Sequence, residues 1–479
     1  MKKFYKDYKI YVITWIIITI LAEGIFLKRL LFTDSNIIIV GGILIIPVAI
    51  FLFLFILTSI ENSFYSIAIM LPLLPVSGYI SLRLGIIDYQ WIFYLFFYCM
   101  FLASLIKNKF YLKMDFNKLK SSKSVLFFAI LMLLIFVNVL LAFNKSLSII
   151  VFLFGFLPFT IYFCLAGLFE PKDRNLFLQK FILCITLGVV LSCVPDFIYW
   201  TYLVSFGMRI YRLYGPLGSN FILGYSLIFY PIIISKLKSS KILYKKIYWI
   251  LFVIQSISLS SQFSRGAFLC VLLVFILLLS NNINRKICII SLCLVLGFMS
   301  IDVFQRSEIS SNSAIQSNAE HKLVKVNPTE YISSQSENRV PLWKAAIKMF
   351  KDYPVMGVGL GNYRYFYTHY SGIKRPYSDA HNFILNSLAE LGIVITIMIL
   401  ACFIIIAFKI YRKSVKEKDI ENKKVLIGFL IGLIAFFIYG NVTGVALQNP
   451  KEIHSYTPTF AVIFIIFYSW YLLNENQIN

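Results

Sequence analysis

Long apolar runs separated by short polar loops dominate the pattern of this sequence. The runs occur at about 10–27, 36–58, 64–80, 91–106, 124–143, 147–169, 177–203, 219–235, 247–263, 264–280, 287–304, 383–408, 425–447 and 458–473. An α-helix needs roughly 20 such residues to cross the hydrocarbon core of a bilayer. The run at 64–80 and the break at 263–264 are the weakest. The pattern therefore predicts an all-α polytopic membrane protein with about 12–14 transmembrane helices.

Charged residues lie mainly in the loops, and they orient the chain. Only 14% of the residues are charged, and 45 Lys and Arg outnumber 22 Asp and Glu. The basic excess is concentrated in the loops 107–123, 236–246 and 409–424. With a cytoplasmic N-terminus all three loops become cytoplasmic, as the positive-inside rule requires. We therefore expect a multi-pass protein of the plasma (inner) membrane with both termini cytoplasmic, and no nucleic-acid partner.

This topology divides the chain into four parts. They are N-terminal transmembrane helices (1–204), a transmembrane core (205–304), a large external loop (305–382) and C-terminal transmembrane helices (383–479). Within the loop, the segment NRVPLWKAAIKMFKDYP has helical periodicity. Its apolar face would carry Leu342, Trp343, Ala346, Ile347 and Phe350, and its other face Lys344, Lys348 and Lys351. A basic amphipathic helix of this kind is typical of a membrane interface.

Four polar segments fall at the external ends of the predicted spans. They are RLYGPLGSNFILGY with Arg212, SSQFSRGAFL with Arg265, ENRVPLWKAA with Arg339, and YSDAHNFILNSLAELG with His381 and Glu390. A single arginine at a span end commonly reaches for lipid headgroups. Three arginines together match the oxygens of a diphosphate, because each guanidinium binds phosphate bidentately. A histidine beside them is a candidate general base. The combination predicts an external site for a membrane-anchored diphosphate.

Two other features predict no further chemistry. The segment GVGLGN (357–362) follows no strand and precedes no GK[ST], so it indicates a turn rather than a phosphate loop. The four histidines lack paired spacing such as HExxH, so we expect neither a metal nor a cofactor.

Several of these segments resemble the O-antigen ligase and O-antigen polymerase superfamily. The resemblance rests on SRGAFLCVLLVFILLL, NRVPLWKAAIKMFKDYPVMGVGLGNYRYFY and DAHNFILNSLAELG. The upstream RLYGPLGSNFILGYSLIFYP is similar to the family's R-x-x-G…N-x-x-G segment, although Ser219 replaces the proline often seen there. Specific motifs carry the resemblance over about residues 205–395. Over the first 200 residues only the succession of apolar spans is similar.

The resemblance implies a metal-independent, inverting membrane glycosyltransferase for cell-surface polysaccharide. Its donor would be an undecaprenyl-diphosphate-linked glycan, and its acceptor another glycan, a lipid or the wall, with membrane lipids around it. Arg212, Arg265 and Arg339 would hold the diphosphate, and His381 would activate the acceptor hydroxyl. Glu390 matches the family's E-x-G, where its role is catalytic or structural.

Two questions stay open at the level of sequence. The motifs do not separate a polymerase, which extends a lipid-linked glycan, from a ligase, which transfers the finished glycan. The alternative function is a polytopic transporter or flippase of lipid-linked glycans. Transporters usually place ionisable residues in the middle of the membrane, whereas the candidate residues here lie near the external span ends.

Overall fold

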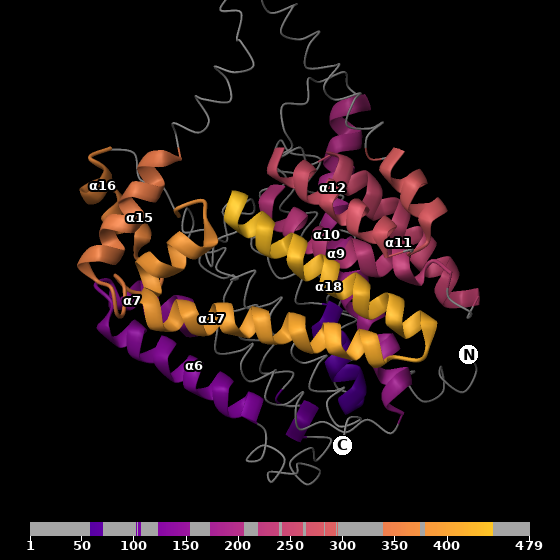
Figure 1. Cartoon of the computed structure of the whole chain (residues 1–479), viewed down its shortest axis with the longest axis horizontal. Helices are drawn as coiled ribbons and strands as arrows, with labels where there is room; N and C mark the ends of the chain where they lie inside the picture. The colour runs from indigo at the N-terminus through magenta and orange to yellow at the C-terminus, as the bar shows by residue number, and fades with distance from the viewer. Residues whose placement is uncertain are drawn as a thin grey trace, which may run out of the picture.

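A computed structural model gives the fold of the chain (Figure 1). It describes residues 58–69, 102, 104–106, 123–153, 173–205, 219–238, 242–261, 265–281, 283–293, 295, 339–373 and 379–443. The principal helices are α6 (Lys123–Leu141), α7 (Lys145–Val151), α9 (Arg174–Ser205), α10 (Ser219–Lys236), α11 (Ile242–Ser261), α12 (Arg265–Ser280), α15 (Val340–Asp352), α16 (Tyr363–Ser371), α17 (Phe383–Lys416) and α18 (Ile420–Thr443). Regular structure in the described ranges is helical throughout, which confirms the all-α prediction.

Helices of membrane-spanning character coincide with predicted spans. Within the described part of the chain, Leu176–Cys193, Phe383–Lys416 and Ile420–Asn441 are long and apolar enough to cross a bilayer. Shorter apolar helices occupy Ala129–Leu141, Ser226–Lys236 and Leu269–Ser280. The predicted spans at 10–27, 36–58 and 458–473, and most of 91–106, lie outside the described residues. The total number of spans therefore stays a prediction.

Small residues bring α10 and α18 into close contact at the centre of the bundle. A Cβ atom added to Gly432 would lie 2.4 Å from the carbonyl oxygen of Ile228, and one added to Gly428 would lie 3.0 Å from that of Pro231. Such close backbone approach is how membrane helices gain packing energy, since lipid supplies no hydrophobic drive. Gly428 faces Pro231, and Gly432, which comes later in α18, faces Ile228, which comes earlier in α10. Helix α18 therefore runs antiparallel to α10.

The hydrogen bonds also fix which helix ends lie together. Asn284, just after α12, donates to the carbonyl of Ile234 near the end of α10 at 2.7 Å, so α12 and α10 end side by side. Asn441 near the end of α18 accepts from the N–H of Ile384 at the start of α17 at 3.2 Å. The starts of α10, α12 and α17 and the end of α18 therefore share one end of the bundle, which we call the α17-start end.

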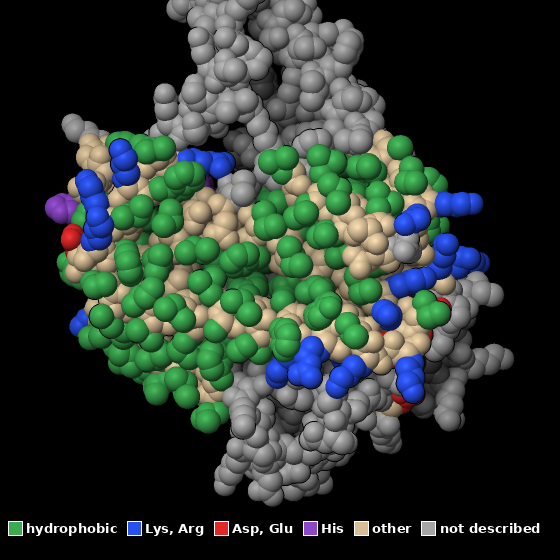
Figure 2. Space-filling model, viewed as in Figure 1, with side chains coloured by type: hydrophobic (Ala, Val, Ile, Leu, Met, Phe, Trp, Pro, Cys, Tyr) green, Lys and Arg blue, Asp and Glu red, His purple; other side chains and the backbone are tan. Residues whose placement is uncertain are grey.

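Basic residues gather at the opposite end. Lys238 follows α10, and the α17–α18 turn carries Lys416, Lys418 and Lys423. Lys123 begins α6, whose other end contacts the first turns of α17. All three basic segments used to orient the chain thus reach this same end. Figure 2 shows Lys and Arg side chains gathered where α17 and α18 meet, beside an almost wholly apolar flank. The arrangement agrees with the orientation argument, and its assignment to the cytoplasm remains a prediction.

Helix α17 is broken at Gly392, and the segment before α16 fills the break. Gly392 has φ +75° and ψ −178°, so the helical hydrogen-bond ladder is interrupted there. The freed carbonyls of Ala389 and Glu390 accept from the N–H groups of Val358 and Gly359 at 2.9 and 3.0 Å. On the other side of the break, the N–H of Ile393 donates to Pro354 at 2.8 Å. The GVGLGN segment is therefore a turn packed onto α17.

Asn138 of α6 ties this turn to the rest of the bundle. Its Oδ1 accepts from the N–H of Leu360 at 2.9 Å, and its Nδ2 donates to the carbonyl of Glu390 at 3.0 Å and to that of Met356. One buried amide thus satisfies backbone groups of both the turn and α17. The side chain holds α6, the turn and α17 together at the α17-start end.

The predicted amphipathic helix is present as α15, and one of its faces packs against the rest of the protein. Leu342, Ala345, Ala346 and Met349 are buried against α16 and α17. Ile347, which was expected on the apolar face, is 41% exposed. The side of α15 that faces the protein thus carries Ala345 and Ala346, and Ile347 lies outside it. Contact of α15 with a membrane interface stays a prediction.

Candidate functional site

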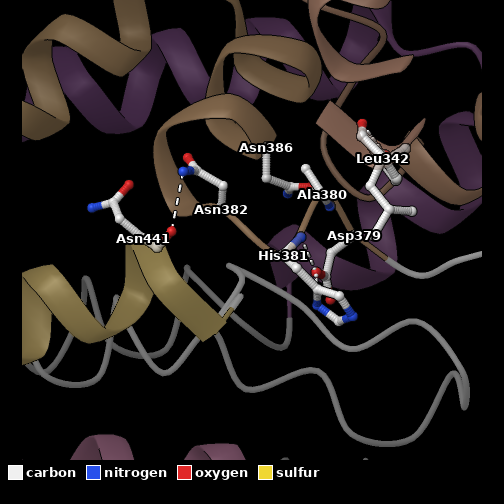
Figure 3. Close-up of polar contacts among 8 residues, drawn as sticks. Leu342, Asp379, Ala380, His381, Asn382, Asn386 and Asn441 are labelled. Atoms are coloured by element: carbon white, nitrogen blue, oxygen red, sulfur yellow. Dashed lines mark hydrogen bonds and ion pairs between the residues drawn. The ribbon is translucent and has the colours of Figure 1, made fainter. Parts of the chain in front are cut away.

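The segment DAHNFILN before and within the first turn of α17 is held by its own asparagines. Asn382 is the N-cap of α17, and its Oδ1 accepts from the N–H of Leu385 at 2.9 Å. Asn386 reaches back with Oδ1 to the N–H of Ala380 at 3.1 Å. An N-terminal asparagine satisfies a helix donor that has no partner within the helix. The two amides fix the turn in which His381 lies (Figure 3).

A residue of the next helix also fixes this turn. Asn441 of α18 accepts from the N–H of Ile384 through its Oδ1, while its own backbone carbonyl accepts from Nδ2 of Asn382 at 3.1 Å. Figure 3 shows Asn441 facing Asn382 across the two helix ends. The position of His381 is therefore set by tertiary contacts as well as by the local sequence.

His381 adopts an unusual backbone conformation beside a buried carboxylate. Its φ is +49°, in the left-handed region that few residues other than glycine occupy. Oδ1 of Asp379 accepts from the backbone N–H of His381 at 2.6 Å and lies 2.8 Å from Nδ1 of the ring. The side chain of His381 is 32% exposed, against 6% for that of Asp379. The ring is thus reachable from outside and rests on an acidic group.

Arg339 begins the helix that packs beside this segment. It occupies the N-cap position of α15, where its carbonyl accepts from the N–H of Trp343 at 3.0 Å. Leu342 in the same turn belongs to one buried cluster with Ala380, the neighbour of His381. Tyr363 of α16 closes this cluster by donating its hydroxyl to the carbonyl of Leu342 at 2.8 Å. The start of α15 and the turn before α17 are therefore brought together.

Arg265 is the first residue of α12, so its backbone lies at the α17-start end of the bundle. Its side chain lies outside the described residues. Arg212 also lies outside them, seven residues before the start of α10 at that same end. The structure thus brings the backbones of Arg265, Arg339 and His381 to one end of the bundle. How Arg212 is positioned remains a prediction.

Glu390 is buried rather than open to a substrate. The residue is 1% exposed, and its Oε1 accepts from the N–H of Tyr363 at the start of α16 at 3.0 Å. A side-chain oxygen at a helix N-terminus stabilises the helix by accepting from an N–H group that has no partner within the helix. Of the two roles left open for this residue, the geometry favours the structural one.

Tyr363 contributes a neutral hydroxyl to the same region. Burial, with Asp379 and other acidic groups nearby, raises the pKa of the Tyr363 phenol far above its ordinary value. The phenol therefore stays protonated at all physiological pH values, which its bond to the carbonyl of Leu342 requires.

In the described ranges, no group of three or more His, Cys, Asp or Glu side chains could hold a metal ion.

The sequence did not single out some of the residues that form this site. Asp379 was visible only as a neighbour of His381, and Asn386 only as a polar residue inside an apolar span. Asn441 lies in a different predicted span, so its contact with Asn382 depends on how the helices pack. A signal was nevertheless present, because an amide inside a membrane span must find a hydrogen-bond partner.

Comparison with known families identifies part of this chain. Residues 250–400 match the O-antigen ligase family, a region that contains Arg265, Arg339, His381 and Glu390 but not Arg212. No curated protein matches the chain. The match covers about a third of the sequence and includes the described site except for Asn441. The chain is therefore an all-α membrane protein whose residues 250–400 match the O-antigen ligase family, and this match confirms the resemblance seen in the motifs of that region.

Proposed function

We propose that this protein is a glycosyltransferase that moves or polymerises a glycan carried on undecaprenyl diphosphate, at the outer face of the plasma membrane. The observation that carries the proposal is that the turn of His381 packs beside the start of α15, at the same end of the bundle as the start of α12, inside the O-antigen ligase domain. Those helix starts are Arg265 and Arg339. A base and two permanent cations at one end of an apolar bundle suit a lipid-anchored anionic donor.

The arginines would act on the leaving group. Breaking the bond between the anomeric carbon and the diphosphate oxygen places negative charge on that oxygen. Arg265, Arg339 and Arg212 would stabilise this charge, because fixed cations are most effective where charge develops in the transition state. The departing undecaprenyl diphosphate is stable as an anion, so it needs no proton from the protein. The isoprenoid chain would remain in the bilayer beside the apolar flank of the bundle (Figure 2).

His381 would act on the acceptor. The hydroxyl of the acceptor glycan, lipid or wall component would give its proton to the imidazole as its oxygen bonds to the anomeric carbon. An imidazole with an ordinary pKa of about 6.5 is largely neutral at pH 7 and able to accept that proton. The proton then passes from the imidazolium to water. In-line attack from the face opposite the diphosphate inverts the anomeric configuration, without a metal or other cofactor.

Purified protein in nanodiscs with a lipid-diphosphate glycan donor and an acceptor tests this proposal. We expect His381→Ala to bind donor normally but to transfer glycan about 10²–10⁴-fold more slowly. Arg265→Ala and Arg339→Ala should weaken donor binding as well as transfer. Lysine at either position should restore little, because an ammonium cannot form the bidentate contact. His369→Ala, an exposed histidine on α16, is the matched control and should behave as wild type.

Two outcomes would contradict the proposal. Normal turnover by His381→Ala would show that His381 is not the general base. Normal turnover by Arg265→Ala would show that Arg265 is not needed to hold the diphosphate. EDTA should leave the wild-type rate unchanged, and a loss of activity with EDTA would contradict the metal-independent mechanism. Product length then separates the two forms of the reaction, since a polymerase gives a ladder of lipid-linked glycans and a ligase a single transfer to another acceptor.

A further inference from the structure

We propose that Asp379 is a positioning residue for His381: its buried carboxylate holds the Nδ1 side of the imidazole and stabilises the imidazolium, so that the opposite nitrogen, Nε2, takes the acceptor proton. This inference rests on the proposed function. It adds a residue and a proton direction that the motifs alone did not assign.

The first support is that one carboxylate oxygen holds both the backbone and the ring of His381. Oδ1 of Asp379 lies 2.6 Å from the backbone nitrogen of His381 and 2.8 Å from its Nδ1. The left-handed φ of His381, +49°, turns the chain back so that residues 379 and 381 face each other. Such backbone strain persists only where surrounding contacts impose it, and it concentrates at functional sites.

The second support is the direction in which the ring is open. Nδ1 is a buried atom, although about a third of the whole side chain is exposed. The exposed part of the ring therefore lies away from Nδ1 and from Asp379. Figure 3 shows the carboxylate against one edge of the ring of His381. An acceptor hydroxyl approaching from outside would meet the other edge, where Nε2 is located.

The third support is the set of charges around the ring. Tyr363 of α16 and Glu390 of α17 lie behind the site, and Arg339 begins α15 beside it. Arg265 begins α12 at the same end of the bundle. Glu390 is occupied with the backbone of Tyr363, and the phenol of Tyr363 is neutral. Asp379 forms the acidic contact with the ring, and it offsets the arginines, which would otherwise disfavour an imidazolium.

The proton balance of the step is simple. The acceptor O–H bond breaks, and its proton goes to Nε2 while the oxygen forms the glycosidic bond. The ring becomes a cation, and the ion pair with Asp379 stabilises it at 2.8 Å. The electrons of the broken anomeric C–O bond leave with the diphosphate. Asp379 itself exchanges no proton with substrate, so it acts through His381.

The pH dependence of transfer by Asp379→Asn distinguishes this role from a merely structural one. Asparagine keeps the shape and can still accept from the backbone N–H of His381, but it carries no charge. Removing a neighbouring anion makes the ring a weaker base, so the acidic limb of the kcat/KM profile should move to lower pH by about one unit. The plateau value of kcat should fall about 10-fold or more, because the base is weaker. Asp379→Glu should keep the wild-type limb.

The matched control is Asp352→Asn, which removes an exposed carboxylate from α15 and should leave the profile unchanged. If the rate of the Asp379→Asn protein fell equally at every pH and the acidic limb of its kcat/KM profile did not move, the positioning role would be overturned. A fully active Asp379→Asn protein would overturn it as well. Failure of the proposed function looks different: wild-type protein would then transfer no glycan, or His381→Ala would turn over normally.

Discussion

The carboxylate of Glu390 in α17 accepts a hydrogen bond from the backbone N–H of Tyr363, the first residue of α16, at 3.0 Å. Two residues later Gly392 breaks α17, and the carbonyls freed by the break bind the turn that leads into α16. The E-x-G motif therefore has a physical explanation in this chain. Its glutamate anchors α16 to α17, and its glycine allows the break that receives the preceding turn.

Replacing Glu390 tests the anchoring role. We expect Glu390→Ala to lower the stability of the folded protein by about 1–3 kcal/mol, because the N–H of Tyr363 would be left buried without an acceptor. Glu390→Gln keeps one oxygen acceptor and should lose much less. Thermal melting of the purified protein in detergent measures the difference. If Glu390→Gln kept the wild-type melting point but lost transfer, the carboxylate would have a catalytic role that its burial does not suggest.

Replacing Gly392 tests the break in α17. A Cβ atom at this position would lie 2.1 Å from the carbonyl oxygen of Val355, in a backbone region open almost only to glycine. We expect Gly392→Ala to prevent accumulation of folded protein in the membrane. Gly372→Ala is the control, since it also has a positive φ but has no atom within 4 Å of the added Cβ. It should cost only about 1 kcal/mol of backbone strain, and equal yields of the two variants would contradict the close packing.

The sequence predicted the helices well because apolar length and loop charge are local properties. The run at 383–408, for example, is contained in α17, and the motif DAHN falls at its start as expected. The break at Gly392 was not predicted, because the mostly apolar residues on both sides continue the helical pattern. Only the turn at 354–362, far away in the predicted loop, supplies the hydrogen bonds that make the break favourable.

In the predicted external loop, too, local sequence patterns predicted the helix but not the surface against which it packs. Periodicity predicted a helix at α15, but it could not tell lipid from protein as the partner of the apolar face. Ala345 and Met349 prove to be buried, while Ile347 is exposed. The contact between Asn441 and Ile384 was also beyond sequence reasoning, because it joins two helices whose packing no local pattern fixes.

The orientation of the bundle can be measured directly. His369 on α16 and Lys418 in the α17–α18 turn are both exposed and belong to opposite ends. In intact cells we expect a cysteine at position 369 to react with an impermeant maleimide and a cysteine at position 418 to react only after lysis. The unsubstituted protein gives the background from the native cysteines. The reverse labelling would show that the site faces the cytoplasm, and it would contradict the proposal that the glycan donor binds at the outer face.

The contact between α18 and the start of α17 should matter for the rate of transfer. Asn441 accepts from the N–H of Ile384 and from the side chain of Asn382, which lie three residues and one residue after His381. We expect Asn441→Ala to lower kcat about 10-fold while donor binding stays unchanged, because a small displacement of a catalytic group is costly to the rate. Binding and turnover by the same nanodisc preparation measure the two effects separately.

Asn281→Ala is the matched control for this last variant. Asn281 follows α12 at the opposite end of the bundle, and its side chain donates to the carbonyl of Leu277 at 2.8 Å. Both substitutions remove one asparagine amide near a helix end, but only Asn441 touches the turn of His381. Equal rates for the two variants would mean that the turn keeps its geometry without α18, and that Asn382 and Asn386 alone are sufficient to fix the base.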